Sequence, residues 1–60
     1  MKQIKIGKAS TNDVVIKDNS VSREHLEVFI DSYNNVFVTD LDSTNGTFVN
    51  GNRIEKSVKL

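Results

Sequence analysis

Apolar and polar residues alternate along much of this sequence, with a repeat of two residues. The alternation is clearest at residues 4–6, 26–30 and 36–38. A repeat of two places every second side chain on the same face of an extended strand. The run Val14-Val15-Ile16 is rich in β-branched residues, long enough for a strand and too short for a helix. The pattern therefore predicts half-buried strands with one apolar face, and no helix of useful length.

Polar clusters separate the predicted strands, at residues 9–13, 17–24, 32–35 and 40–45. They are dense in Ser, Thr, Asn and Asp, whose side chains bond to nearby backbone and favour turns. The cluster at 32–35 is expected to turn one strand into the next. Residues 22–25 are expected to open a short helical turn with Ser22 as its cap. The predicted fold class is all-β, a small antiparallel unit with long polar loops.

Two Asn-Gly pairs lie close together, Asn45-Gly46 and Asn50-Gly51. An Asn-Gly pair between strand residues is typical of a type I′ hairpin turn, in which both central residues have positive φ. Asn50-Gly51 has strand residues on both sides and is expected to form this turn. Asn45-Gly46 follows an Asp-Ser-Thr run and opens a strand, so its glycine is expected to permit an unusual backbone path.

Length and composition limit the size of the core. The chain has 60 residues, of which 37% are hydrophobic, and a chain this short buries only about 60% of the surface that it exposes when unfolded. Without cysteine it has neither a disulfide nor a thiolate metal site. The single histidine, His25, cannot anchor zinc, which takes about four nitrogen or sulfur ligands. We expect one small domain over residues 1–60, with no metal and no cofactor.

Charge and hydropathy restrict the partners. Eight basic and eight acidic residues cancel, so no field of one sign draws the chain to nucleic acid or to an anionic membrane. The N-terminal MKQIKIGKAS lacks the apolar segment of a secretory signal, and no run approaches the roughly 20 apolar residues of a membrane helix. We therefore expect a cytoplasmic protein that binds neither nucleic acid nor membrane, and an anion site formed only locally.

Catalysis is poorly supported by the sequence. Ser22 and His25 lie three residues apart, and an aspartate such as Asp40 or Asp42 would complete a Ser-His-Asp set. Nothing in the sequence resembles a nucleophile elbow, however, and such triads are recognised by geometry. The segment Gly7-Lys8-Ala9-Ser10 fails the P-loop pattern because no hydroxyl follows its lysine. No catalytic residue is assigned, and an enzyme is the least favoured class.

The polar loops, taken together, suit a phosphate group. Lys8 follows the first strand, Ser22 and Arg23 lie in the second loop, and residues 43–45 lie before the hairpin. If these loops gather at one end of the sheet, they present two cations, several hydroxyls and an amide. A phosphate monoester carries about −1.5 to −2 charge and accepts hydrogen bonds at three oxygens, so it matches this set.

Four segments resemble, in order and spacing, the signature of the forkhead-associated (FHA) domain. They are Gly7-Lys8, Asn12-Asp13-Val14-Val15, Ser22-Arg23-Glu24-His25 and the stretch from Asp40 to Gly51. They correspond to that family's G-R, N-D, S-x-x-H and N-G elements. The resemblance implies an antiparallel β-sandwich of the FHA/SMAD-like kind, here with core strands only, whose long polar loops at one end bind phosphothreonine peptides without catalysis.

The resemblance also implies roles for individual residues. The phosphopeptide-binding residues would be Lys8, Ser22, Arg23, Thr44 and Asn45, with Asn45 bonding the peptide main chain. Residues that support the site without touching the ligand would be Gly7, Asn12, Asp13, His25, Gly46, Asn50 and Gly51. In the family, residues near Ser20 select the side chain three positions after the phosphothreonine. Ser20 is small and uncharged, so a strong demand for an acidic residue there is not expected.

Two departures from the family pattern matter. The family's phosphate-binding arginine is Lys8 here, which keeps the charge but lacks the planar fork that grips phosphate bidentately. The chain is also shorter than the usual domain at both ends, which leaves unpaired strand edges that invite association with another chain. The sequence thus leaves two functions open. One is phosphothreonine-dependent binding, and the other is phosphate-independent interaction or oligomerisation through the sheet surface or its edges.

Overall fold

The computed structural model describes all of residues 1–60 and contains seven strands and no helix. The strands are β1 (Lys2–Gly7), β2 (Val14–Val15), β3 (Leu26–Ile30), β4 (Val36–Asp40), β5 (Thr47–Val49), β6 (Asn52–Ile54) and β7 (Val58–Lys59). The all-β prediction is therefore confirmed. No helix is long and apolar enough to cross a membrane.

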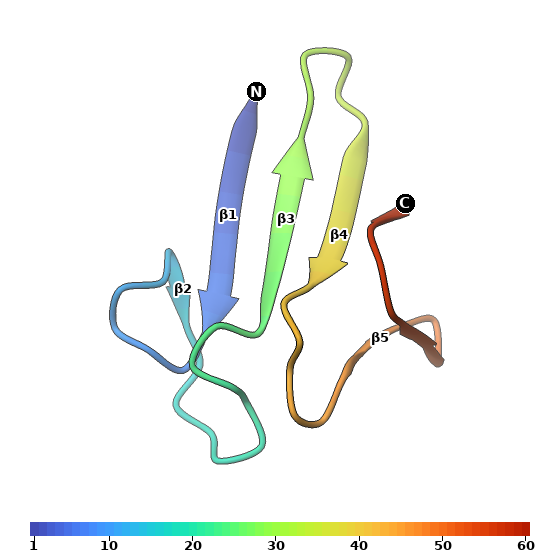
Figure 1. Ribbon diagram of the computed structural model, residues 1–60. Helices are drawn as coiled ribbons and strands as arrows, with labels where there is room; N and C mark the ends of the chain where they lie inside the picture. The colour runs from blue at the N-terminus through green and yellow to red at the C-terminus, as the bar shows by residue number, and fades with distance from the viewer.

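Five of the strands form one sheet, in the order β2-β1-β3-β4-β7, and β5 and β6 form a separate hairpin beside it (Figure 1). Strands β1, β3, β4 and β7 pair antiparallel, as the pattern predicts. Strand β2 pairs with β1 in parallel, which the pattern does not predict. A parallel pair usually needs a connection of about a dozen residues. Here residues 8–13 suffice because β2 meets only the last two residues of β1.

The prediction of a helical turn over residues 22–25 is wrong. This segment is an irregular bend, and the Ser22 hydroxyl accepts a hydrogen bond from the backbone N–H of Thr44 at 2.9 Å. An N-cap hydroxyl would instead accept from the backbone two or three residues ahead. The Ser22 hydroxyl therefore joins two loops and is not available to cap a helical turn.

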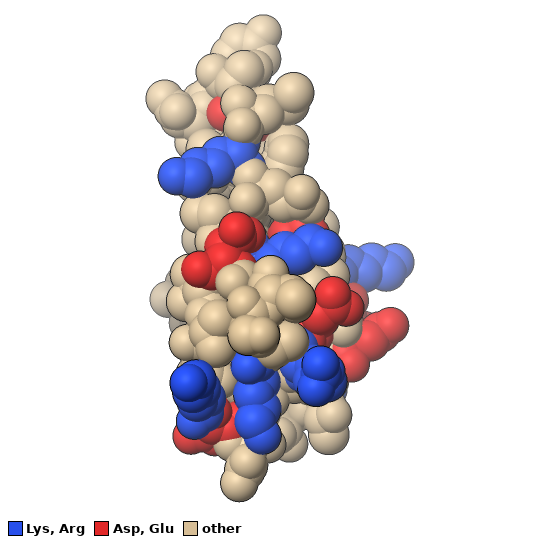
Figure 2. Space-filling model, turned by 90° about the vertical axis from the view of Figure 1, so that its left-hand side faces the viewer, with Lys and Arg blue, Asp and Glu red and all other residues tan.

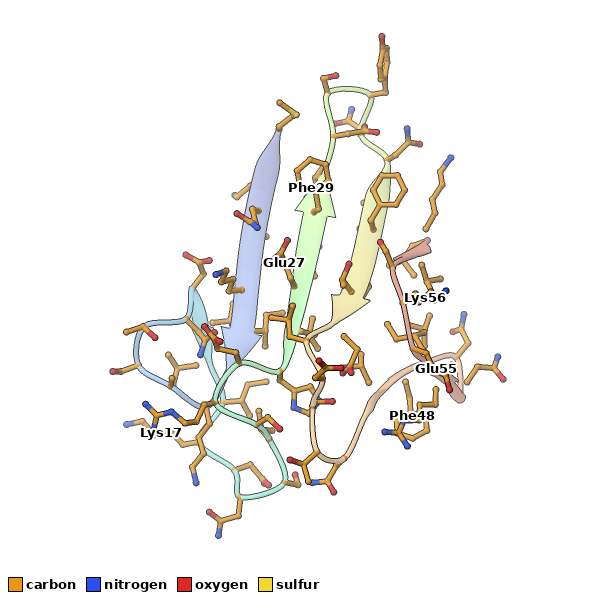
Figure 3. The ribbon with its side chains drawn as sticks, in the orientation of Figure 1. Lys17, Glu27, Phe29, Phe48, Glu55 and Lys56 are labelled. Atoms are coloured by element: carbon orange, nitrogen blue, oxygen red, sulfur yellow. The ribbon has the colours of Figure 1, made fainter.

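The register of the sheet places its apolar residues in rows on one face. Ile4 lies beside Val28, Val28 beside Val38, and Val38 beside Val58 across β1, β3, β4 and β7. The opposite face carries charged and aromatic residues, and Glu27 and Phe29 project from it along β3 (Figure 3). Phe29 and Phe37 face each other across β3 and β4 with ring centroids 6.4 Å apart. The predicted alternation is thus realised strand by strand.

The interior of the molecule is largely polar. Only two apolar side chains are buried, those of Val38 and Ile54, whereas four polar residues are buried: Asn12, His25, Ser43 and Thr47. No buried side-chain nitrogen or oxygen lacks a hydrogen-bond partner, as folded proteins require of buried polar groups. All four polar residues lie in or next to the loops at one end of the sheet, so the buried polar contacts of the fold are concentrated there.

The two Asn-Gly pairs have different backbone conformations. Asn50 and Gly51 both have positive φ, 51° and 82°, and they join β5 to β6 as the predicted type I′ turn does. In the other pair only Gly46 has positive φ, at 85°. The first pair in sequence therefore bends the chain into β5, and the second makes the hairpin.

Candidate functional site

Three loops meet at the end of the sheet where β1 and β4 finish, shown at the bottom of Figure 1. They are residues 8–13, residues 16–25 and residues 41–46. Together they line a shallow hollow, whose residues are Lys8, Asn19, Ser20, Val21, Ser22, Arg23, Asp42, Thr44 and Asn45. The structure therefore brings together all five residues that the sequence proposes for phosphopeptide binding.

His25 joins two of these loops from inside. Its side chain is 8% exposed. Its Nδ1 lies 3.0 Å from the backbone nitrogen of Ser22, and its Nε2 lies 2.9 Å from the carbonyl oxygen of Gly46. A backbone N–H only donates and a carbonyl only accepts, so the ring is the neutral tautomer with its proton on Nε2. The imidazole thereby sets the separation of Ser22 from the Asn45-Gly46 turn.

The same two loops are joined again at the surface. The Thr44 backbone N–H donates to the Ser22 hydroxyl at 2.9 Å, and the Asn45 amide nitrogen donates to the Ser20 carbonyl at 2.8 Å. The hydroxyls of Ser22 and Thr44 are 3.4 Å apart. Two hydroxyls and one amide oxygen thus face the hollow from a frame that is already closed before any ligand arrives.

The loop after β1 is fixed to the Ser22–Arg23 segment by backbone bonds and by Asn12. The Lys8 and Ala9 backbone N–H groups donate to the carbonyls of Ser22 and Arg23, at 2.9 and 3.1 Å. The buried Asn12 amide donates to the Arg23 and Ala9 carbonyls at 2.7 and 2.8 Å. This bonding holds the Lys8 and Arg23 backbones side by side.

Two further predicted supports lie at the base of the same loop. Gly7 is buried at the end of β1, where a Cβ atom would clash with the backbone carbonyl oxygen of Arg23 and lie 2.9 Å from its carbonyl carbon, so a larger residue does not fit. The Asp13 carboxylate accepts a hydrogen bond from the Lys5 backbone N–H at 2.8 Å. Asp13 thus ties the start of β2 to β1.

Asp40 organises the third loop, a role that the sequence does not reveal. Its carboxylate accepts hydrogen bonds from the Ser43 hydroxyl at 2.5 Å, the Ser43 backbone at 3.2 Å and the Thr47 hydroxyl at 2.8 Å. Partial desolvation acts to raise the pKa of Asp40, but the bonds from Ser43 and Thr47 outweigh it, and the pKa lies below its ordinary value. An aspartate followed three residues later by serine is a turn signal that would have suggested this role.

Asn19 is the second residue that the sequence reasoning misses. Its side-chain oxygen accepts a hydrogen bond from the Lys8 ammonium at 3.0 Å, and both residues line the hollow. No motif in the sequence marks it, because the contact joins two loops whose proximity depends on the sheet.

The hollow is locally cationic in a neutral chain. Lys8 and Arg23 line it together with one carboxylate, Asp42. Asp18 does not line the hollow; its Oδ1 accepts hydrogen bonds from the Ser20 hydroxyl at 2.6 Å and the Ser20 backbone N–H at 2.8 Å, and these bonds lower the pKa of Asp18 and keep it ionised. Seen from the β2 side, Lys and Arg side chains gather at the loop end (Figure 2), and Lys17 also lies at this end (Figure 3). No cluster of His, Cys, Asp and Glu could hold a metal ion.

The architecture is that of a small β domain with a loop-built cationic hollow, and comparison with known proteins identifies its family. Residues 4–60 match the FHA domain family. The chain therefore belongs to the FHA domain family.

Two bacterial proteins contain segments similar to this chain. The transcriptional regulatory protein EmbR of Mycobacterium tuberculosis is 39% identical over 56 residues, which is 93% of this chain and 14% of EmbR. The solved complex of Mycobacterium tuberculosis EmbR with a low-affinity phosphopeptide matches 97% of this chain and 15% of that chain, with 36% identity and a TM-score of 0.88. The FHA domain of the CT664 protein from Chlamydia trachomatis has a TM-score of 0.94 and 37% identity, over 98% of this chain and 60% of that chain. The chain thus spans a small part of EmbR and about three-fifths of that solved FHA domain.

Proposed function

We propose that this chain is a phosphothreonine-peptide-binding module that mediates phosphorylation-dependent protein-protein interaction, without catalysis. The observation that carries the proposal is the hollow at the loop end, where two cations, two hydroxyls and an amide converge on a frame built by His25 and Asn12. A phosphate dianion needs this combination of charge and donors. The solved EmbR complex with a phosphopeptide supports the proposal, because its chain shares the fold and 36% of the matched residues.

Each binding residue has a distinct role in the proposal. Lys8 and Arg23 supply positive charge to the phosphate. The Ser22 hydroxyl donates a hydrogen bond to a phosphate oxygen while it still accepts one from the Thr44 backbone N–H. The Thr44 hydroxyl lies against the phosphothreonine, and Asn45 bonds the peptide main chain with its amide oxygen and second N–H while it still donates to the Ser20 carbonyl.

A titration with a degenerate phosphothreonine peptide pool, beside its unphosphorylated twin, tests the function. Followed by NMR, the phosphorylated pool should shift signals in the loops around Lys8, Ser22 and Asn45, and the twin should not. Ser22→Ala should weaken binding about 10- to 100-fold, since a charge-assisted hydrogen bond is worth roughly 1.5–3 kcal/mol, and Asn45→Ala should weaken it about three- to tenfold, since its bond to the peptide main chain is neutral. The matched controls are Ser57→Ala and Asn52→Ala, exposed positions outside the hollow. Equal affinity for both pools would refute the proposal.

Two finer properties belong to the same proposal. Ser20 lines the hollow with a small uncharged side chain, so an acidic residue three positions after the phosphothreonine is not required. The module acts in the cytoplasm, where protein kinases make its ligand. A peptide array that showed an absolute need for an acidic residue at that position would overturn the first of these.

A second function is favoured by the apolar surface of the sheet edge. In β2, an edge strand, Val14 is 44% exposed and Val15 is 39% exposed, and the next residue, Ile16, is 42% exposed. Unpaired edges with apolar side chains promote pairing with another chain. Self-association through these edges would be independent of phosphate. Ser22→Ala and Asn45→Ala would then leave partner binding unchanged, which separates this function from the first.

A further inference from the structure

The cation that replaces the family's arginine is held by a specific partner. The Lys8 Nζ donates to the Asn19 side-chain oxygen at 3.0 Å, across eleven positions of sequence. Both side chains line the hollow beside Ser22 and Thr44. A free lysine ammonium is a mobile point charge on a four-carbon stem, and ordering such a side chain is entropically unfavourable. The contact with Asn19 removes much of that freedom before a ligand arrives.

The geometry of the ammonium group gives this contact a second effect. An ammonium has three N–H donors, and Asn19 accepts only one of them. With that N–H fixed, the other two have defined directions. A guanidinium owes its grip on phosphate to two donors in a fixed fork, and an ammonium with one fixed N–H offers two oriented donors in a similar way.

The neutral character of the partner is equally important. The neighbouring residue Asp18 would be a stronger acceptor, but the Lys8 ammonium bonds to the Asn19 amide oxygen instead, while Asp18 Oδ1 accepts the two hydrogen bonds of Ser20. A carboxylate on the ammonium would cancel the charge that a phosphate needs, whereas an amide oxygen orients the ammonium and leaves its charge intact. One carboxylate, Asp42, already lines the hollow. The positive charge on Lys8 must therefore be kept if the hollow is to attract a phosphate.

We propose that Asn19 is a positioning residue for phosphate recognition, which holds the Lys8 ammonium at the hollow with two donors free for phosphate oxygens. The inference rests on the proposed phosphopeptide-binding function of this site. It assigns to Asn19 an effect that acts through Lys8, and not through contact with the peptide.

A double-mutant cycle tests the inference by calorimetric titration of a phosphothreonine peptide into the full chain. Asn19→Ala should weaken binding about three- to tenfold when Lys8 is present, the range expected for a single exposed hydrogen bond. The same substitution should change affinity less than twofold in a Lys8→Met background, because coupled residues are not additive. In a Lys8→Arg background the effect should also be small, since the guanidinium fork is oriented without Asn19.

Further variants make the test specific. Asn19→Asp should bind more weakly than wild type despite keeping an acceptor, because it neutralises the ammonium. Asn52→Ala, an exposed asparagine in β6, is the control and should change nothing. Circular dichroism of each variant confirms that the chain is folded.

Two results would count against the inference in different ways. If Asn19→Ala weakens binding equally with and without Lys8, Asn19 acts by itself and the positioning role is wrong, while the phosphopeptide function stands. If the wild-type chain fails to distinguish the phosphorylated peptide from its twin, the proposed function fails and the inference falls with it.

Discussion

His25 shows how a residue that touches no ligand can define a binding site. It is buried, and its two ring nitrogens bond to backbone atoms of two different loops, at Ser22 and at Gly46. Ser22 is itself one of the residues proposed to contact the ligand, and two others, Arg23 and Asn45, are the chain neighbours of Ser22 and Gly46. The imidazole therefore acts as a spacer between the phosphate side and the peptide side of the hollow.

Replacement of His25 should weaken both stability and phosphopeptide binding. In His25→Ala, the Ser22 N–H and the Gly46 carbonyl lose their partner, which costs about 1–3 kcal/mol for each group that stays buried and unpaired. A 60-residue chain has a total stability of only about 3–9 kcal/mol. His25→Gln, which can keep one of the two bonds, should be intermediate. Urea denaturation and peptide titration of both variants measure the two effects, and wild-type affinity in a stably folded His25→Ala chain would contradict the spacer role.

At the level of single residues, the FHA resemblance names both residues that line the hollow and residues that support it, such as Asn12 and His25. The positions of Lys8, Ser22 and Asn45 follow from motifs. The bond of Asn19 does not, because it depends on which loops the sheet brings together. The wrong helical turn at residues 22–25 has the same cause, since the Ser22 hydroxyl is taken by a residue 22 positions away. The bonds of Asp40 are local, to Ser43 and Thr47, and a turn signal in the sequence would have suggested them.

The β4–β5 connection is the element whose stability depends most on charge. The Asp40 carboxylate, at the end of β4, accepts hydrogen bonds from Ser43 within the connection and from Thr47 at the start of β5. These bonds favour the ionised carboxylate and lower its pKa in the folded chain. A group whose pKa is lower in the folded chain stabilises the fold at pH values above its unfolded pKa, about 3.9 for aspartate. This stabilisation is lost as the pH falls through the folded pKa.

The melting temperature should accordingly fall as the pH drops below about 4, with the loss partly due to Asp40. Asp31 contributes in the same direction, because its bonds from Asn35 also lower its pKa. Asp40→Asn should lower the melting temperature at neutral pH and reduce its further fall below about pH 4. The control is Asp42→Asn, because Asp42 is an exposed aspartate of the same loop whose side chain makes no hydrogen bond. Thermal melts from pH 3 to pH 7 compare the three chains, and parallel curves would argue against the role of Asp40.

The turn of the β5–β6 hairpin depends on backbone conformation and not on packing. Gly51 has φ of 82°, and a Cβ at this position would have no atom within 4 Å. Gly51→Val should therefore destabilise the chain by about 1–2 kcal/mol through left-handed strain alone, and Gly51→Asn should cost less because asparagine tolerates this region. Chemical denaturation measures both. Equal stability of the valine variant would mean that the turn can change type.

The elements themselves follow closely from the sequence. The repeat of two and the turn chemistry predict the positions of β1, β3, β4, β5 and β6, since each rests on local alternation or on an Asn-Gly signal. The parallel pairing of β2 was not predictable, because its register with β1 depends on bonds made by Asn12 and Asp13 in the loop between them.

The whole molecule is more open than a compact domain of its mass. Its accessible surface is 4469 Å², whereas a compact monomer of 6.7 kDa exposes roughly 3,900 Å². Its principal extents, 35 × 25 × 16 Å, are those of a slab. With only Val38 and Ile54 buried among its apolar residues, the sheet keeps much of its apolar face in partial contact with solvent.

This surplus of surface leads to a prediction about the chain in isolation. We expect it to self-associate, with an average mass in sedimentation equilibrium that rises with concentration, because contact between apolar surfaces gives about 25 cal/mol for each Å² removed from water. Val15→Lys, at the exposed edge of β2, should shift the equilibrium towards monomer, since an edge lysine blocks strand pairing. Ser57→Lys adds the same charge at an exposed position outside any strand and should leave the equilibrium unchanged. A well-folded monomer at high concentration would contradict the prediction, and it would also show that the hydrogen-bonded loop end alone suffices to hold the fold.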